Sequence, residues 1–506
     1  MKRACTLSQC LFQKASSALK RQCPREVLVC TLAVIFGFVF VPPAARSQTQ
    51  AFTASLAGVV HDASELAVTG AKVTLTSPEK GITRTFTTDA EGRYSFAVLP
   101  PGTYSLVIEA TGFAPYEEQG IQLAAGQAAS ESINLQVGQV QTQVTVSESQ
   151  ALLLATENAN VSSDLNEQQV QQLPVNLRNV FGLVLLNSSV NNSTQLQLLN
   201  GGGQSGTADQ DISFLNFGGG YFGTTAYLLD GHWDTAADWG GVIYVPSMDS
   251  VQEAKIQTNG FTAQYGWSTG NVYNVVTRSG SSSLHGDAFE FLRNDKLDAN
   301  FFFSNANGIP KTPFHRNQFG IVGGGPVWIP KLYQQRNKTF FFAAYEGLRQ
   351  SSPVAYTATV PTTAERNGNF SAIPQSRYNP FSTTQTANGF TRTPFAGNQI
   401  PASLMSTVAK NLISYYPQPT NGGLANNFVT FAPAPTQSNE WSLRLDHNFT
   451  DNLQMFARWS NKNEFKVGNP AFYGANDPGG PYLRQPNNRE DGATGFNWVL
   501  NPTTVI

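Results

Sequence analysis

The chain has 506 residues, of which 13% are charged, and its 32 Lys and Arg against 34 Asp and Glu give a formal net charge of −2 at pH 7. All four cysteines lie near the amino terminus (Cys5, Cys10, Cys23 and Cys30), which excludes disulfide scaffolds, thiolate metal sites and cysteine nucleophiles from the rest of the chain. The composition is polar without being strongly charged, and it argues against a basic protein that binds nucleic acid.

The amino terminus has the layout of a secretory signal peptide. A region rich in Lys and Arg precedes the apolar stretch 27–41, and Pro42 ends that stretch. Small residues at Ala45 and Ser47 predict cleavage after Ser47 and export by the Sec route, with residues 1–47 removed. A membrane anchor is the alternative, but about fifteen apolar residues fall short of the roughly twenty that a spanning helix needs.

Removal of residues 1–47 changes the charge balance. It takes away seven of the 32 Lys and Arg and one of the 34 Asp and Glu, which leaves a net charge near −8 and argues further against a nucleic-acid partner. No second long apolar run follows, so contact with a membrane would require alternating strands. Composition alone does not exclude a soluble β protein.

Residues 48–138 predict a small antiparallel β-sandwich. Apolar residues alternate with polar ones, and the apolar face consists of Val73, Leu75, Tyr94, Phe96, Val98, Tyr104, Leu106 and Ile108. Turn-forming residues at 89–92 and 100–102 separate these stretches. A period of two with one apolar face indicates half-buried strands around a common core.

This region resembles the carboxypeptidase regulatory-like domain. The resemblance rests on the run GITRTFTTDAEGRYSFAVLPPGTYSLVIEATGF and on residues 58–62 and 70–75 before it. It implies a transthyretin-like sandwich, classed with carbohydrate-binding-like folds, and no peptidase chemistry. His61 stands alone, without the glutamate spacing of a zinc peptidase, so we predict a structural role for it.

Residues 139–160 form a polar linker with one strand-like run. The run is similar to the TonB box of transporters energised from the inner membrane, a segment that pairs with an edge strand of the energy-transducing partner. The candidate box residues are Thr142, Gln143, Val144, Thr145 and Val146. Gln141 stands where an acidic residue is common, and an ordinary linker strand is the alternative.

Residues 161–280 change to a helical period and then to short β segments. Apolar residues at helical spacing follow Pro174, and Asp164 with Glu167 suggests the cap of an earlier short helix. The series that follows, including residues 246–256 and the run NGFTAQYGWSTGNVYNVVTRSG, is similar to the plug domain of TonB-dependent receptors. The resemblance implies a small α+β unit that fills a barrel lumen, and the candidate ligand-loop residues are Asp230, His232, Trp233 and Asp234.

Residues 281–506 turn aromatic and strand-like. The runs HGDAFEFLRNDKLDANFFF and RNQFGIVGGGPVWIPKLYQQRNKTFFFAAYEGLR closely resemble the first barrel strands of Oar-like TonB-dependent receptors. The pattern of residues 441–460 supports membrane strands without the resemblance, because one face carries Trp441, Leu443, Leu445, Leu453, Met455, Ala457 and Trp459. The other face carries polar residues that suit a wet lumen, although a soluble hairpin over a core would show the same alternation.

The barrel is expected to be incomplete. Large transporters close with about 22 strands, whereas residues 351–439 are rich in Pro, Asn, Gly and Thr and predict a long loop. The expected fold class is therefore mainly β: a transthyretin-like sandwich, a small α+β plug and an incomplete antiparallel transmembrane barrel. A clipped fragment, a truncated gene product and a remnant all fit this reading.

The sequence gives little support for nucleotide binding or calcium binding. The glycine-rich run 201–206 has the spacing of a dinucleotide fingerprint but no following apolar helix. Asp230, Asp234 and Asp238 recur every fourth residue, whereas an EF-hand places oxygen ligands every second residue. We therefore predict no catalytic residue, no metal site, no cofactor and no enzymatic activity.

The sequence predicts an outer-membrane TonB-dependent receptor that takes up an extracellular ligand. The resemblance implies three partners: a TonB-type energy transducer of the inner membrane, outer-membrane lipid, and an extracellular ligand that could be an oligosaccharide, a siderophore, a cobalamin or a peptide. The regulatory-like and plug domains would lie on the periplasmic side. The rival hypothesis is a surface protein that binds glycans or adheres to other cells, anchored by its strands.

Overall fold

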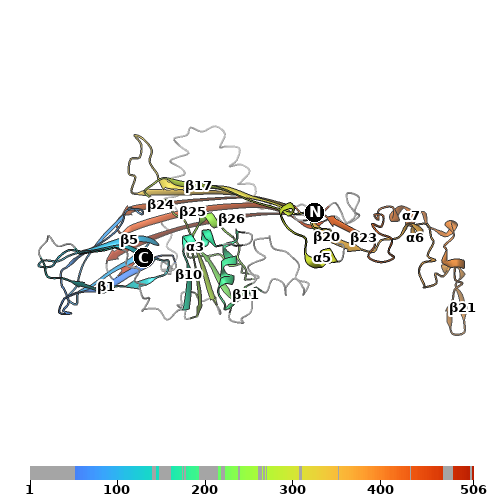
Figure 1. Cartoon of the computed structure of the whole chain (residues 1–506), viewed down its shortest axis with the longest axis horizontal. Coiled ribbons are helices and arrows are strands. Elements are labelled where there is room, and N and C mark those ends of the chain that lie inside the picture. The colour runs from blue at the N-terminus through green and yellow to red at the C-terminus, as the bar shows by residue number, and fades with distance from the viewer. Residues whose placement is uncertain are drawn as a thin grey trace, which may run out of the picture. The chain divides into compact units, whose positions relative to one another are not determined.

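The computed structural model describes most of the chain after residue 51 (Figure 1). The described residues are 52–138, 144–147, 161–173, 175, 178–192, 215–217, 223–237, 240–259, 265, 268, 271–306, 310–351, 353–432, 435–470, 482–501 and 504–505. The predicted signal peptide, Thr142, Gln143, Asp238 and the glycine-rich run 201–206 lie outside them. Among the described helices, none has the length and apolar character needed to cross a bilayer.

The first region forms a sandwich of two sheets. One sheet has the order β4-β1-β7, with β8 also pairing with β1, and consists of β1 (Ala54–Asp62), β4 (Arg93–Leu99), β7 (Ala128–Ser130) and β8 (Ile133–Leu135). The other has the order β3-β2-β5-β6-β9 and consists of β2 (Lys72–Ser77), β3 (Ile82–Thr87), β5 (Gly102–Glu109), β6 (Tyr116–Leu123) and β9 (Val144–Ser147).

The predicted apolar face of the sandwich is confirmed. All eight residues named from the alternation are buried, and seven of them belong to one core cluster with Leu56 and Val60. The sandwich is not purely antiparallel, however, because β7 and β8 pair with β1, and β9 with β6, in parallel. Alternation fixes which side chains face the core, but it does not choose the neighbouring strand.

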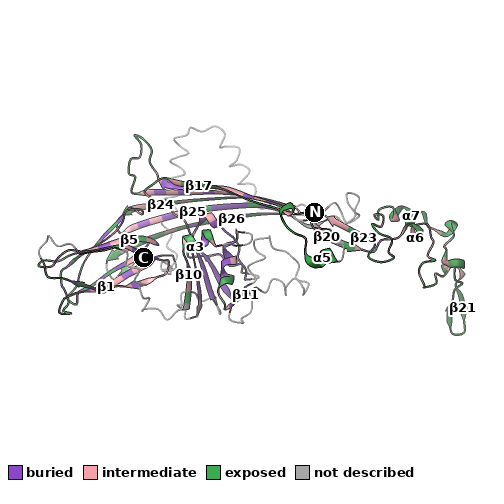
Figure 2. Cartoon of the chain, in the orientation of Figure 1, coloured by how far each residue is buried: buried purple, intermediate pink, exposed green. Residues whose placement is uncertain are grey.

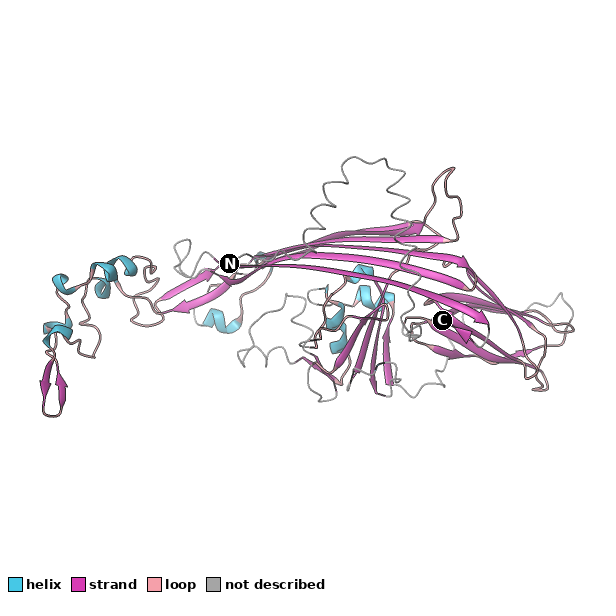
Figure 3. Ribbon diagram, turned by 180° about the vertical axis from the view of Figure 1, so that it is seen from behind, coloured by secondary structure: helices cyan, strands magenta, loops and turns pink. Residues whose placement is uncertain are grey.

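The described residues between 161 and 280 combine one sheet with short helices, and we call this region the central unit. Its sheet has the order β10-β15-β16-β13-β14, with β10 (Val161–Leu165), β13 (Thr225–Leu229), β14 (His232–Trp233), β15 (Val251–Asn259) and β16 (Asn271–Thr277). The remaining elements are α3 (Glu167–Gln172), η3 (Val180–Leu186), η5 (Met248–Ser250) and the pair β11 (Val190–Asn192) and β12 (Leu215–Phe217). Figure 3 shows the helices among these strands.

The helical elements of the central unit differ in detail from expectation. The helical spacing after Pro174 gives a 3₁₀ helix that buries Val180, Phe181 and Val184. The cap of α3 is Asn166, which forms a capping box with Gln169. Asp164 instead lies in β10, where its carboxylate faces Lys255 Nζ at 3.5 Å.

The third region is one antiparallel sheet in which each strand pairs with the next. Its order is β17-β18-β19-β24-β25-β26-β27. The strands are β17 (His285–Asn294), β18 (His315–Pro326), β19 (Thr339–Ser351), β24 (Pro435–Thr450), β25 (Leu453–Pro470), β26 (Tyr482–Asn501) and β27 (Thr504–Val505). Short helices η7 (Asp295–Leu297) and α5 (Phe302–Ala306) follow β17. Within the described residues this sheet does not close on itself.

Residues of different burial alternate along the long strands, as the colours of the ribbon in Figure 2 show. Trp441, Leu443, Leu445 and Trp459 are 45–51% exposed, whereas the side chains between them, such as Ser442 and Arg458, are buried. In residues 441–460 the exposed face is therefore apolar, and the covered face is mainly polar, with Phe456 as a buried apolar member. This arrangement is the one expected of membrane strands around a polar lumen.

The segment between β19 and β24 contains several short elements of its own. They are β20 (Val354–Ala358), α6 (Thr363–Arg366), η8 (Pro380–Ser382), β21 (Thr384–Thr386), β22 (Gly389–Thr391), η9 (Ala396–Asn398), η10 (Ala402–Leu404), α7 (Thr407–Ile413) and β23 (Phe428–Ala432). β20 pairs with β23, and β21 with β22. The predicted loop 351–439 is thus shorter than expected, because residues 435–439 already belong to β24.

Candidate functional site

The candidate site is the set of contacts between the central unit and the inner face of the long strands. It begins at Asp230, in the tight turn between β13 and β14, with a φ of 52°. Asp is among the few residues other than glycine that adopt this left-handed conformation readily. The Asp230 backbone N–H donates to the carbonyl of Val275 at 2.8 Å, which fixes the turn against β16.

The Asp230 carboxylate binds two arginines of the long strands. Arg444 Nη1 of β24 donates to Asp230 Oδ1 at 3.1 Å, and Arg458 Nε of β25 donates to Oδ2 at 2.7 Å. Thr277 adds its backbone N–H at 2.8 Å and its hydroxyl at 2.8 Å. Asp230 and Arg458 are each 1% exposed, so this ion pair is almost fully removed from water.

The register of the sheet explains why an acid is needed here. Arg444 and Arg458 lie directly opposite each other on β24 and β25, and like charges at opposed positions repel. Asp230 lies between their guanidinium groups, while Asp446 and Asp491 each pair with one arginine from the strand side. Burial by itself would raise the pKa of Asp230, but Arg444 and Arg458 outweigh it and hold that pKa below its ordinary value.

The other candidate ligand-loop residues are divided between interior and surface. Asp234 is buried and accepts from the Tyr244 backbone N–H at 2.9 Å, and burial raises the pKa of Asp234 well above its ordinary value. His232 lies edge-on to Phe456 with ring centroids 6.1 Å apart, and Trp233 is 43% exposed. The turn therefore contacts the inner face of the long strands at Asp230. Ligand contact by these four residues stays a prediction.

A second group of contacts joins residues 244–247 to two buried glutamates. Glu440 of β24 accepts from the Tyr244 hydroxyl and from the Ser247 backbone N–H, both at 2.8 Å. Glu346 of β19 accepts from the Ser247 hydroxyl at 2.6 Å. Lys462 Nζ of β25 lies 3.1 Å from Glu440 Oε2 and partly balances the charge. The central unit thus meets the inner face through charged and polar groups at these two places, and Arg178 and Arg278 also lie over phenylalanine rings of the strands.

The sequence did not identify the strand residues that contact the central unit, which are Arg444, Arg458, Glu440 and Glu346. Arg444 and Arg458 belong to the polar face predicted for residues 441–460, and the sequence indicated no partner for them. A usable signal was present, because an arginine or glutamate on the inner face of a membrane strand needs an opposite charge. The identity of that partner, some 214 and 228 positions away in sequence, required the tertiary structure.

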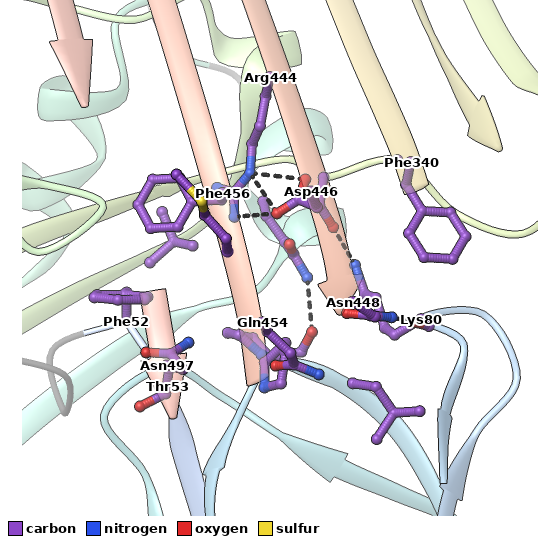
Figure 4. A pocket seen from close by; sticks show the side chains of 18 residues that line it. Phe52, Thr53, Lys80, Phe340, Arg444, Asp446, Asn448, Gln454, Phe456 and Asn497 are labelled. Atoms are coloured by element: carbon purple, nitrogen blue, oxygen red, sulfur yellow. Dashed lines mark hydrogen bonds and ion pairs between the residues drawn. The ribbon is translucent and has the colours of Figure 1, made fainter. Parts of the chain in front are cut away.

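The sandwich also contacts the other two regions. Asn448 Nδ2 of β24 donates to the Lys80 carbonyl at 3.0 Å, and Lys80 Nζ donates to Ser279 Oγ at 2.5 Å. Burial lowers the pKa of Lys80. A small cavity of about 60 Å³ lies beside these groups. Figure 4 shows the side chains that line it, which come from the sandwich, the central unit and the strands.

A further contact joins the sandwich to β15. The Ala125 backbone N–H donates to Glu253 Oε1 at 2.5 Å, and Lys255 Nζ donates to the Ala125 carbonyl at 3.2 Å. Burial raises the pKa of Glu253 to about 7.

Of the five candidate TonB-box residues, the structure describes Val144, Thr145 and Val146. Residues Val144–Ser147 form β9, which pairs in parallel with β6 of the sandwich.

Among the described residues there is no group of three or more His, Cys, Asp or Glu side chains that could hold a metal ion.

Comparison with known families identifies two domains. Residues 55–136 match the carboxypeptidase regulatory-like domain, and residues 276–506 match the outer membrane beta barrel domain. The chain is 28% identical over 301 residues to the TonB-dependent transporter Oar of Myxococcus xanthus, an alignment that covers 58% of this chain and 26% of that protein. The chain thus matches about a quarter of the length of this curated relative.

Solved structures of outer-membrane proteins are also similar. The outer membrane transporter YddB of Escherichia coli matches with 10% identity and a TM-score of 0.42, over 67% of this chain and 37% of that one. The ferric enterobactin receptor PfeA of Pseudomonas aeruginosa, as a mutant, matches with 11% identity and a TM-score of 0.36, over 67% and 38% of the two chains. On the domain and sequence matches, the chain is a homologue of the TonB-dependent transporter Oar that carries a carboxypeptidase regulatory-like domain and an outer membrane beta barrel domain, and its location is the outer membrane.

Proposed function

We propose that the chain acts in TonB-dependent uptake of a ligand across the outer membrane. In this proposal the central unit is a plug seated on the lumen side of the strands, and the sandwich lies on the periplasmic side. An extracellular ligand binds outside, and a TonB-type transducer pulls on the segment around Val144–Ser147 to open a path. The chain carries out binding and transport and catalyses no reaction.

The contact of Asp230 with Arg444 and Arg458 is the observation that carries this proposal. It joins the central unit to the covered face of β24 and β25, whose opposite face carries exposed apolar side chains. Interfaces made of hydrogen bonds and ion pairs can exchange their partners for water when a unit moves, whereas a large apolar interface cannot do so without exposing hydrocarbon. Such an interface suits a plug that must stay seated and yet be displaced.

Deletion of the gene in its own bacterium tests the proposal. The mutant should lose growth on one nutrient supplied at low concentration, with iron sources, oligosaccharides, cobalamin and peptides compared in defined media. The gene should restore growth, and a gene that lacks codons 142–147 should not. Uptake that persists without the transducer, or after the inner-membrane proton gradient has been collapsed, would contradict energised transport.

The rival function, binding of surface glycans by the sandwich, has less support. Sugar rings stack on exposed aromatic faces, whereas Tyr94, Phe96 and Tyr104 are 2%, 4% and 1% exposed and belong to the core. A glycan array probed with the full chain in detergent separates the two functions. Strong binding that is lost when the sandwich is deleted, with uptake unchanged, would favour the rival.

A further inference from the structure

The turn between β2 and β3 contacts the connection between the central unit and the long strands. That connection, residues 278–284, leads from β16 to β17. The Ser282 backbone N–H donates to the Glu79 carbonyl of the turn at 2.9 Å, and Lys80 Nζ donates to Ser279 Oγ at 2.5 Å. Because the connection joins the two regions covalently, a contact that holds it limits how far the central unit can move from β17.

The sandwich also contacts the ends of two long strands, β24 and β25. Asn448 Nδ2 of β24 donates to the Lys80 carbonyl at 3.0 Å (Figure 4). Arg84 Nε of β3 donates at 3.0 Å to the carbonyl of Asp451, which lies in the turn between β24 and β25. Arg84 is 7% exposed, and its Nη1 donates to the Ala97 carbonyl within the sandwich. One guanidinium group therefore joins the sandwich to the end of the sheet.

A third set of contacts joins the sandwich to β15 of the central unit. The Ala125 backbone N–H donates to Glu253 Oε1 at 2.5 Å, and Lys255 Nζ donates to the Ala125 carbonyl at 3.2 Å. Gln252 Nε2 donates to the Pro101 carbonyl at 3.3 Å. The sandwich thus holds the central unit and the strand ends at the same time.

These contacts are of a kind that can be released. They are hydrogen bonds, whose groups exchange protein partners for water when the regions separate. The three regions also leave a cavity of about 60 Å³ where they meet, so their surfaces are incompletely packed there. The sandwich is therefore held in the resting chain without a continuous apolar interface at this junction.

We propose that the sandwich is a clamp: it holds the central unit against the ends of the long strands, and it must separate from them before the central unit can move. This inference rests on the proposed function, in which the central unit is the plug. The linker 139–160 connects the sandwich to the central unit, so a force on the linker acts on both regions. Such a force opens the clamp first and displaces the plug second.

A single cysteine reports when the covered face of the strands opens. Ser442 lies on that face between Glu440 and Arg444, both of which contact the central unit, and it is 5% exposed. The experiment uses the full chain in detergent, with the native cysteines changed to serine. Ser442→Cys should react with fluorescein maleimide only when the central unit moves away.

Gly81→Ala weakens the clamp without removing a hydrogen-bonding group. Its Cβ would lie 2.4 Å from the carbonyl oxygen of Asn337, in the turn between β18 and β19. The sandwich and the strands must then move apart, and labelling of Ser442→Cys should become roughly five- to a hundredfold faster. Gly70→Ala is the matched control, because its φ of 73° is close to the 63° of Gly81 and nothing lies within 4 Å of its Cβ position.

Asn448→Ala weakens the clamp from the strand side and leaves the sandwich unchanged. Removal of one hydrogen bond should make labelling of Ser442→Cys about two- to tenfold faster. Unchanged rates in both Gly81→Ala and Asn448→Ala would overturn the clamp.

A cross-link tests whether the clamp must open. Glu79→Cys and Ser282→Cys lie where the two backbones meet, and a short bis-methanethiosulfonate reagent should join them. A monofunctional methanethiosulfonate is the control, because it blocks the same two thiols without joining them. Ser442→Cys should label at least about fivefold more slowly in the joined form. Equal rates in the two forms would show that the central unit moves while the clamp is closed, which overturns the proposal.

Neither measurement uses a ligand or the transducer, so failure of the clamp and failure of the proposed function are distinguishable. Unchanged labelling together with growth that depends on the gene overturns the clamp alone. Altered labelling without such growth overturns the proposed function, and the part of the clamp in transport falls with it.

Discussion

At the scale of single residues, the central observation is one carboxylate between two arginines. Arg444 and Arg458 oppose each other on neighbouring strands, and Asp230 from the central unit lies between them. A buried ion pair adds little net stability over apolar packing, but removing one partner is costly because it leaves a buried charge without compensation. Asp230 is therefore expected to matter more for how the central unit is seated than for its own folding.

Changing Asp230 to Asn should weaken the attachment of the central unit. The substitution keeps the shape and removes the negative charge, and the loss in free energy of unfolding is expected to be roughly 3–5 kcal/mol. Urea unfolding in detergent micelles, followed by tryptophan fluorescence, measures it. The matched control is Asp287→Asn, at an exposed position on β17, which should change the free energy by less than about 0.5 kcal/mol. Equal effects would mean that Asp446 and Asp491 neutralise the arginines without Asp230.

Glu253 should make the contact between the sandwich and the central unit depend on pH. Burial raises the pKa of Glu253 from 4.5 to about 7, against the Ala125 N–H, Lys255 and Lys80, which lower it, and with Asp164, which raises it. The folded state therefore holds the proton more tightly than the unfolded chain and loses stability as the pH rises from about 4.5 to about 7, by up to about 3 kcal/mol.

The variant Glu253→Gln isolates this effect. Denaturant midpoints at pH 5 and pH 8 should differ less in the variant than in the unchanged chain, because glutamine does not titrate. Glu109→Gln is the control, since Glu109 pairs with Lys72 on the surface. An unchanged pH dependence in Glu253→Gln would assign the titration to Glu131, whose pKa burial raises to about 8.

At the scale of elements, the long strands combine glycine with phenylalanine across the sheet. Three direct cross-strand pairs place a ring against a glycine: Phe289 with Gly320, Phe319 with Gly347, and Phe456 with Gly495. The ring covers the backbone that glycine leaves open and holds the register of the strands. Glycine at these positions therefore supports the sheet, although glycine usually weakens a strand.

Changing Gly320 to Ala should destabilise the sheet. A Cβ atom there would lie 2.5 Å from the Tyr345 carbonyl oxygen and 2.5 Å from the Phe289 ring, and overpacking of this kind costs about 1–3 kcal/mol. The yield of chain that refolds into micelles, and its urea midpoint, should both fall. Gly422→Ala is the control because nothing lies within 4 Å of its Cβ position. A neutral Gly320→Ala would mean that the strands separate more easily than the pairing indicates.

At the scale of the whole molecule, two groups of polar contacts connect the central unit to the strands, in addition to Arg178, whose guanidinium lies over the Phe289 and Phe291 rings of β17. One is centred on Asp230, and the other on Glu440 and Glu346. Under the proposed function, both must be released before a ligand can pass. Arg458 of the first group and Tyr244 of the second both interact with Ser460, so substitutions in the two groups are expected to be coupled.

The double variant Asp230→Asn with Glu440→Gln, placed in the chromosomal gene, should make the outer membrane leakier than either single variant. Sensitivity to a large antibiotic that the outer membrane normally excludes measures this, with the level of protein in the membrane checked by immunoblot. Asp287→Asn with Glu109→Gln is the matched control, because both positions are exposed. Double-variant cells as resistant as the control would contradict a plug held at these two places.

The sequence by itself determined which side chains face a core, a membrane or a lumen. The apolar alternation in the sandwich and in residues 441–460 is confirmed because the period of two is a property of every strand and needs no knowledge of its neighbours. The resemblances to the carboxypeptidase regulatory-like domain and to Oar-like barrel strands were also available from the sequence, and the domain and relative matches agree with them. The resemblance of the central unit to a plug stays a prediction. The sequence did not predict the parallel pairings of β7, β8 and β9, because local patterns do not encode which strand is the partner.

Only the tertiary structure decided which residues meet across the domains. Asp230 was selected from the sequence as part of an exposed ligand loop, and the structure buries its carboxylate between Arg444 and Arg458. The strand-like character of Val144–Ser147 was predicted, whereas its docking on β6 was not. The physical reason is the same in both cases: an ion pair or a strand pairing depends on distance in space. Asp230 lies 214 and 228 positions from its two arginines, and β9 pairs with a strand that is not its neighbour in sequence, so only the complete fold brings these residues together.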